Sequence, residues 1–168
     1  MTEERKWKAQ DICSLLELRH PHKLGKWVTF RELRDTTGNY HKAALDFVAL
    51  GAWPSSGYQL TGYEIKVSRS DWLQELRRPG KRAPWQGQLN ELWVAAPLGV
   101  VQRHEVPEKW GLVVTTKSGS KLRTVKRPTP DDDATPTRQL WISLLRAGMA
   151  EQLDLRAKVR EVTTLGGV

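Results

Sequence analysis

Three polar residues stand out because each interrupts an apolar stretch that reads as a β-strand. Asp46 lies within "AALDFVAL", residues 43–50, and Glu64 and Lys66 lie two positions apart within "GYEIKV", residues 62–67. Since side chains alternate between the two faces of a strand, Glu64 and Lys66 share one face. An ionised carboxylate is costly to bury alone, so such acids are usually paired, hydrogen-bonded or bound to a metal.

These residue types suit the hydrolysis of a phosphodiester. Mg²⁺ takes hard oxygen ligands and keeps several waters, so Asp46, Glu64 and the backbone carbonyl of Ile65 are a sufficient ligand set. The ion would activate a bound water, and Lys66 would orient that water or offset charge developing on phosphorus. The alternative is that Glu64 and Lys66 form an ordinary surface ion pair while Asp46 caps a turn.

Positive charge follows the three residues along the chain. The 168 residues carry 27 Lys and Arg against 19 Asp and Glu, a formal net charge of +8. Phosphate backbones bind basic clusters, so nucleic acid, and DNA first, is the expected partner. A basic balance that only favours solubility is the alternative. The expected DNA-binding residues are Arg69, Arg77, Arg78, Lys81 and Arg82.

Trp72 and Trp85 are interleaved with this basic cluster. They could stack on the bases of opened DNA, but burial in the core is the favoured interpretation for both. A second basic group, between residues 117 and 127, is either another DNA contact or a solvated face.

Helices are predicted at both ends of the chain. Approximate apolar stripes predict helices over 4–20 and 138–161. Thr29, with Glu32 three residues later, forms a capping-box pattern and predicts a short helix over 30–36. Another helix is predicted to begin near Asp71, with Ser68 or Ser70 as its cap.

Strands are predicted between these helices. Apolar runs predict strands over 43–50, 58–67 and 91–97, and "LVVTTKSGSKLRTV" predicts a hairpin. The order predicts an α/β fold with a mixed central β-sheet flanked by helices.

The expected domain organisation is a single body with a helical extension. We expect one domain over 1–125, a Pro/Asp-rich linker over 126–137, and a C-terminal helix and tail over 138–168. The terminal helix either packs on the core or stands away from it. In the second case it is a candidate surface for a homodimer or another partner.

The arrangement of Asp46 and Glu64-Ile65-Lys66 resembles the PD-(D/E)XK nuclease superfamily. "EIKVSRSDW", a loop with Lys81 and then "NELWVAAPLGV" is more narrowly similar to its MmcB-like and VRR-NUC-like DNA-repair branch, over residues 41–116. The resemblance implies a restriction-endonuclease-like core. It also implies Mg²⁺ or Mn²⁺ held by Asp46, Glu64 and the Ile65 carbonyl, with Asp46, Glu64 and Lys66 as the catalytic residues.

The sequence departs from that family in several places. Leu45 replaces the proline expected before the Asp, and Asn90-Glu91 stands where the branch often has Cys-Asp. Many members have a further acid on the first helix, for which Glu17 and Glu32 are both candidates. His41 either contacts the scissile phosphate or is a turn residue without a special role. These three residues are the candidate accessory residues.

Other function classes are less favoured. The single cysteine, Cys13, excludes an intrachain disulfide and a Cys-rich zinc site. "MTEERKWKAQ" does not resemble a secretory signal and no apolar run is long enough to span a membrane, so we expect a cytoplasmic protein without a membrane partner.

The expected function is a metal-dependent DNA endonuclease in repair, recombination or phage DNA processing. The alternatives are a catalytically inactive DNA-binding protein on the same fold, and a scaffold that acts through its terminal helix. The sequence does not distinguish among duplex, flap, junction and single-stranded substrates, or between DNA and RNA.

Overall fold

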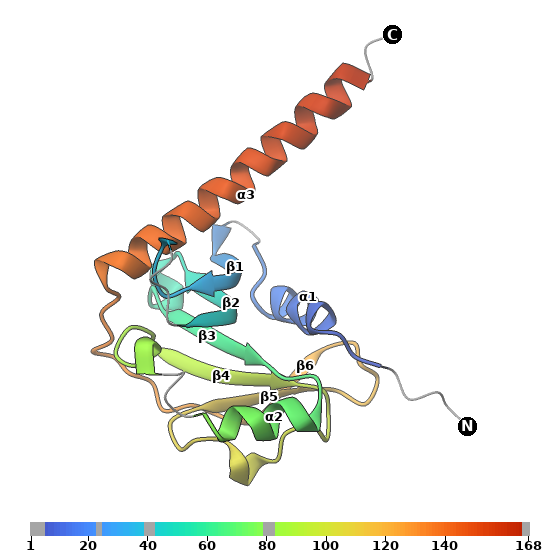
Figure 1. Ribbon diagram of the computed structural model, residues 1–168, viewed down its shortest axis with the longest axis vertical. Helices are drawn as coiled ribbons and strands as arrows, with labels where there is room; N and C mark the ends of the chain where they lie inside the picture. Colours follow the sequence, from blue (N-terminus) through green and yellow to red (C-terminus); the bar gives the residue numbers. More distant parts are fainter. Residues whose placement is uncertain (1–5, 23–24, 39–42, 79–82, 166–168) are drawn as a thin grey trace.

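A computed structural model of the chain describes residues 6–22, 25–38, 43–78 and 83–165, with side chains as far as residue 157. Its centre is a six-stranded mixed sheet, and a long C-terminal helix extends away from it (Figure 1). The predicted α/β class is therefore confirmed. The strands are β1 Trp27–Arg34, β2 Ala44–Gly51, β3 Leu60–Ile65, β4 Glu91–Ala96, β5 Gly111–Thr115 and β6 Leu122–Lys126. The helices are α1 Ala9–Arg19, α2 Arg69–Leu76 and α3 Arg138–Leu165, with short 3₁₀ turns η3 Pro54–Ser56 and η5 Arg103–Glu105.

The strands lie in chain order across the sheet. β1, β2 and β3 form an antiparallel meander, β3, β4 and β5 are parallel, and β6 returns antiparallel to β5. Parallel neighbours need a crossover connection, and α2 supplies the one from β3 to β4. The end of β3, with Glu64 and Ile65, therefore leads directly into α2.

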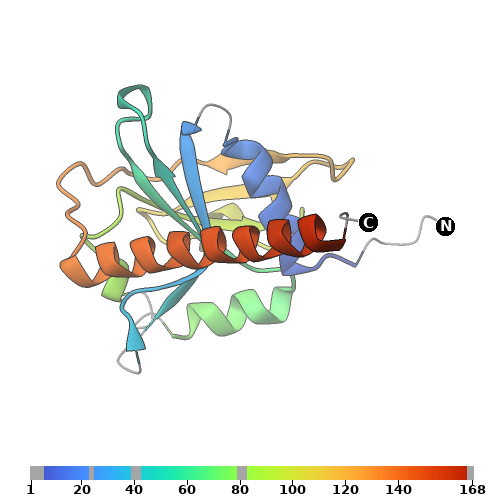
Figure 2. The same cartoon turned by 90° about the horizontal axis from the view of Figure 1, so that it is seen from above.

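Helices cover both faces of the sheet (Figures 1 and 2). On one face, Ile12, Cys13 and Leu16 of α1 pack on side chains that include Phe47 and Tyr63. On the other face, Trp72 of α2 packs over β4 and β5, while Leu140 and Leu144 of α3 pack near β1 and β2. Sheets buried on both faces carry continuous apolar runs, which is the pattern of β2 and β4.

β1 corrects the prediction of a helix over 30–36. All its residues except Glu32 pair with β2, and Phe30 and Leu33 are buried. Thr29 Oγ1 lies 2.8 Å from His22 Nε2 instead of capping a helix, and Glu32 adopts a left-handed φ of 51°. Pairing with β2 therefore outweighs the local capping pattern, because strand formation depends on neighbours that the local sequence does not contain.

The terminal elements differ from their predictions only in length. α1 begins at Ala9, so Trp7 precedes the helix and packs against its core cluster as a partly buried side chain. α3 runs to Leu165. No helix in the described part of the chain is both long and apolar enough to cross a membrane.

The segment predicted as a linker is attached to the body of the protein. Its first residue, Lys126, is the last residue of β6. Asp131 donates a backbone hydrogen bond to Asn90 and accepts one from the Asn90 side chain. Thr137 donates two to the side chain of Gln88. α3 therefore starts from a fixed point on the body and extends beyond it.

Candidate active site

Asp46 lies where β2 and β3 part from each other. Their ladder ends at the pair Phe47–Tyr63, and one step further along the same register Asp46 stands opposite Glu64. There the backbone N–H of Ile65 donates a 2.7 Å hydrogen bond to Asp46 Oδ2. A side chain thus continues the connection between the strands after the main-chain ladder has ended.

The carbonyl of Ile65 lies on the same side of its strand. In an extended strand the N–H and C=O of one residue point to the same neighbour, so this carbonyl also points towards β2 and Asp46. The Ile65 side chain is buried in the α1-side core, which fixes the backbone in this orientation.

Lys66 is held between two buried carboxylates. Its Nζ lies 3.0 Å from Glu64 Oε2 and 3.2 Å from Glu75 Oε2. Glu64 is 4% exposed and Glu75 is 7% exposed, so neither is a solvated surface acid. The arrangement differs from the surface ion pair considered as an alternative for Glu64 and Lys66.

Burial and neighbouring charges shift the pKa values of this group. Burial raises the pKa of Glu64, Lys66 opposes that shift, and the charge of Asp46 adds to it. Burial alone would lower the pKa of Lys66, but the carboxylates of Glu64, Glu75 and Asp46 outweigh it and raise the value. Lys66 is therefore a positive charge at neutral pH rather than a proton acceptor.

Glu75 is a site residue that sequence reasoning missed. It lies on α2 three positions after Trp72, and both side chains point into the protein. Residues three apart share one helix face, so burial of Trp72 offered a signal. "DWLQELRR" is nevertheless so rich in charge that it reads as a solvated helix.

The two candidate accessory acids lie near Asp46 rather than near Lys66. Glu32 is on β1, and the register of β1 with β2 places it opposite Asp46. Glu17 is on α1 and forms a 2.7 Å ion pair with Arg31. The charges of Asp46, Glu17 and Glu32 all raise the pKa of Cys13, whose burial is the larger cause. The third candidate, His41, lies outside the described residues.

The basic residues after the motif occupy different environments. Arg77 and Arg78 are exposed just after α2. Arg69 instead forms a bidentate ion pair with Glu105 of η5 and donates to the carbonyl of Val100. Lys81 and Arg82 lie outside the described residues.

Glu105 ties α2 to the η5 turn. Besides Arg69, it accepts hydrogen bonds from Trp72 Nε1 and from the backbone of Gln102. The Arg69 hydrogen bonds are the main cause that lowers the pKa of Glu105 to about 2. Trp72 and Trp85 are both buried, as the favoured interpretation of the sequence required.

The donor atoms of Asp46 and Glu64, where β2 and β3 separate, suit a hard divalent cation. Asp46 Oδ1 and Glu64 Oε1 take part in no hydrogen bond among the described residues. Oxygen donors of this kind, with waters completing the shell, match the preference of Mg²⁺. However, no group of three or more His, Cys, Asp or Glu within the described ranges is arranged to hold a metal. The residues fit an ion that keeps several waters and not a site made of side chains alone.

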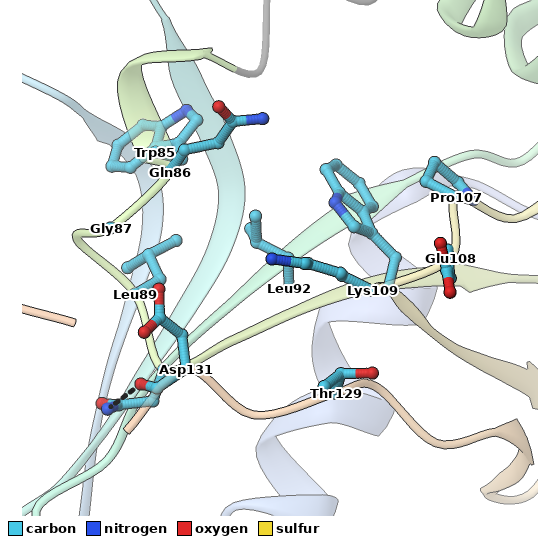
Figure 3. A pocket seen from close by; sticks show the side chains of 12 residues that line it. Trp85, Gln86, Gly87, Leu89, Leu92, Pro107, Glu108, Lys109, Thr129 and Asp131 are labelled. Atoms are coloured by element: carbon cyan, nitrogen blue, oxygen red, sulfur yellow. Dashed lines mark hydrogen bonds between the residues drawn. The ribbon is translucent and has the colours of Figure 1, made fainter. Parts of the chain in front are cut away.

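A cavity of about 470 Å³ lies away from these acids. It opens between the segment before β4, the turn before β5 and the segment after β6. Figure 3 shows Trp85 and Leu89 on one side and Pro107 and Glu108 on the other. None of the catalytic or metal-binding residues expected from the sequence lines it.

Comparison with known proteins finds one similar fold and assigns no activity. No family model matches the chain, and no curated protein matches it. The structure is similar to that of SPO1766, a protein of unknown function from Silicibacter pomeroyi, with a TM-score of 0.62 and 15% sequence identity over 92% of each chain. At this identity the similarity establishes a shared fold.

Proposed function

We propose that this protein is a nuclease that requires a divalent cation, Mg²⁺ or Mn²⁺, and hydrolyses phosphodiester bonds in DNA. The observation that carries the proposal is the position of Asp46 opposite Glu64 where β2 and β3 part, with Lys66 beside Glu64. An acid pair that can hold a cation, with a lysine next to it, supplies the two things that catalyse phosphodiester hydrolysis, an activated water and positive charge near the phosphate.

The proposed roles follow from the contacts. Asp46, Glu64 and the carbonyl of Ile65 would hold the cation, which supplies an ionised water and positive charge against the phosphate. Lys66, kept protonated by its carboxylate partners, would bind a phosphate oxygen and stabilise the charge that develops on it. Since Lys66 carries its proton at neutral pH, it acts here as a charge and a hydrogen-bond donor.

Exposed basic residues extend the proposed substrate surface. Arg77 and Arg78 follow Glu75 closely at the end of α2, so phosphates bound there would lead to the acids. Arg69 has a structural partner in Glu105, and we assign it to the anchoring of α2 rather than to DNA. We propose that the protein acts on DNA in the cytoplasm, in repair, recombination or the processing of phage DNA.

The second candidate is a DNA-binding protein without catalysis. One observation favours it: Lys66 occupies one oxygen of Glu64 and Ile65 occupies one oxygen of Asp46, so each acid already has a partner. In this case the lysine would neutralise the acids permanently and the basic residues alone would serve binding.

One experiment separates the two candidates. Supercoiled plasmid, flap and junction DNA are incubated with the protein in Mg²⁺, in Mn²⁺ and in chelator, beside Lys66→Met. The nuclease proposal expects cutting with either metal, none in chelator and little by the variant. Binding of the DNA without any cutting, at equal strength with metal and with chelator, would favour the second candidate.

A further inference from the structure

The Lys66 ammonium has a second carboxylate partner from another element. Glu64 is on β3, whereas Glu75 is on α2 and reaches the ammonium from the helix that covers this end of the sheet. The two N···O distances are nearly equal, 3.0 Å and 3.2 Å. Lys66 therefore bridges the strand and the helix.

A cation on Glu64 would disturb this bridge. Two positive centres that share one carboxylate repel each other, and the repulsion is strong where water is largely excluded. Water is largely excluded around this ion pair, since the side chains of Lys66 and Glu64 are only 12% and 6% exposed. Without another partner, the ammonium would leave the site when the cation enters.

Glu75 supplies that other partner. It contacts Lys66 from α2, which is not part of the sheet that carries Asp46 and Glu64. It also adds a negative charge, so Asp46, Glu64 and Glu75 with Lys66 carry a formal charge of −2, which one divalent cation neutralises.

We propose that Glu75 is a positioning residue that keeps Lys66 in the site when Glu64 turns to a cation, so that cation and ammonium are present together. The proposal rests on the proposed metal-dependent activity. It assigns to α2 a part in the chemistry and not only in the core, and it explains why a helix rich in charge buries one of its acids.

The test measures Mn²⁺ affinity by calorimetry and DNA cutting at saturating Mn²⁺, in the full chain. We expect Glu75→Gln to bind Mn²⁺ about tenfold more weakly, because one nearby negative charge is removed, and to cut at least about tenfold more slowly, because Lys66 is no longer held. Glu75→Asp should recover part of both effects. Lys66→Met should bind Mn²⁺ at least as tightly as the parent and yet cut poorly.

Two further variants control for folding and for helix placement. Glu105→Gln removes another carboxylate that anchors α2, and it should leave Mn²⁺ affinity within about threefold of the parent because it is not a partner of Lys66. Lys66→Met with Glu75→Gln removes both charges of one pair. If Glu75→Gln alone does not fold, this double variant should still bind Mn²⁺ about as the parent does, since the two remaining carboxylates restore the formal charge of the parent site.

The outcomes separate the two proposals. Parent-like binding and cutting by Glu75→Gln, or equal effects of Glu105→Gln, would overturn the role of Glu75 while the nuclease proposal stands. A double variant that folds but binds Mn²⁺ far more weakly than the parent would also overturn it. If the parent binds Mn²⁺ and shows the expected pattern of affinities but cuts no DNA, the nuclease proposal fails and the coupling through Glu75 remains. A parent that binds no divalent cation removes both.

Discussion

The backbone N–H of Ile65 donates its hydrogen bond to the Asp46 carboxylate at 2.7 Å, at the point where the ladder between β2 and β3 has ended. One oxygen of Asp46 therefore joins two strands, while its charge acts on Glu64 across the gap. The two roles can be separated by substitution, because asparagine keeps an acceptor oxygen and loses the charge.

Asp46→Asn should leave folding almost intact and remove activity. We expect its free energy of unfolding to stay within about 1 kcal/mol of the parent, since the hydrogen bond to Ile65 is retained. Mn²⁺ affinity and cutting should both fall by about tenfold or more, with partial rescue of cutting by excess Mn²⁺. Asp46→Ala should also be destabilised by about 1–3 kcal/mol, because the Ile65 N–H is left unpaired. Urea unfolding and plasmid cleavage test this, and an Asp46→Asn protein that cuts like the parent would contradict it.

Lys66→Met should separate binding from cutting. If Lys66 stabilises charge in the transition state, its removal should lower the rate about a hundredfold and leave DNA affinity within a few-fold. Electrophoretic mobility shift and single-turnover cleavage measure the two quantities. Lys117→Met, at the exposed tip of the β5–β6 hairpin, is the matched control for the removal of a positive charge. Equal effects of the two substitutions would show that Lys66 contributes only general charge.

The strands near the site and the helix after them could be predicted from the sequence, whereas the contact between Glu75 and Lys66 could not. Asp46 and Glu64 each interrupt an apolar run, so their unusual burial is visible in the local pattern. Glu75 has charged neighbours in the sequence, and it is buried where α2 brings it to Lys66. That contact depends on the crossover from β3 to β4, which the spacing of residues along α2 does not encode.

Contacts between residues far apart in the sequence also explain why β1 was predicted as a helix and Arg69 as a DNA-binding residue. Residues 30–36 satisfy a local capping pattern, but β2 offers ladder pairs that the local sequence does not contain. Arg69 belongs to a basic cluster in the sequence, yet Glu105, 36 positions away, binds its guanidinium. In both cases a contact with a distant part of the chain determines the structure, whereas the local sequence favours a different one.

Arg77 and Arg78 should contribute to DNA affinity without contributing to chemistry. Replacing both with Ala should weaken binding and reduce the slope of log affinity against log salt by up to about two units, roughly one for each phosphate that is no longer neutralised. Adding Lys81→Ala should lower the slope further. Fluorescence anisotropy over a salt series gives the slope, with Lys117→Ala/Lys121→Ala as the control pair. If the salt dependence changes only in the control pair, the DNA-binding surface lies on the β5–β6 hairpin and not at the end of α2.

His20 should make folding sensitive to mild acid. Burial, and secondarily Arg19, lower the pKa of His20 from 6.5 to about 4. The unfolded chain therefore binds more protons than the folded one between these values, and stability falls as pH drops from about 6.5 towards 4. The full decrease for this shift is about 3 kcal/mol. Urea unfolding from pH 7.5 to 4.5 measures it.

A His20→Gln variant serves as the comparison, since it keeps a polar side chain near Tyr63, the 2.7 Å partner of His20 Nε2. Its unfolding free energy should depend less on pH over the same range. Identical pH profiles for the parent and the variant would assign the acid sensitivity to other groups.

The outer face of α3 carries exposed apolar side chains that the body of the protein does not cover. They are Trp141, Ile142, Leu145, Met149 and Leu153, with Leu145 67% and Leu153 61% exposed. Leu140 and Leu144, on the inner face, pack on the sheet. A large apolar patch on a projecting helix is typical of an interface.

We propose that a second copy of the chain covers this face in an antiparallel helix pair. With the two-fold axis at Met149, Leu145 of one copy lies beside Leu153 of the other. The apolar stripe of the helix is therefore complementary to itself, as a two-fold interface requires. We expect the parent to have the mass of a dimer by light scattering, and Leu145→Glu/Met149→Glu to have the mass of a monomer.

Sedimentation at several concentrations tests this helix pair further. The parent should move from monomer to dimer as its concentration rises, because the apolar stripe is then covered by a second copy. Leu145→Glu/Met149→Glu should stay monomeric over the same range, because the two carboxylates would be buried in the interface. If the parent is still monomeric at about 100 μM, where most specific interfaces are formed, the apolar face belongs to a different protein partner.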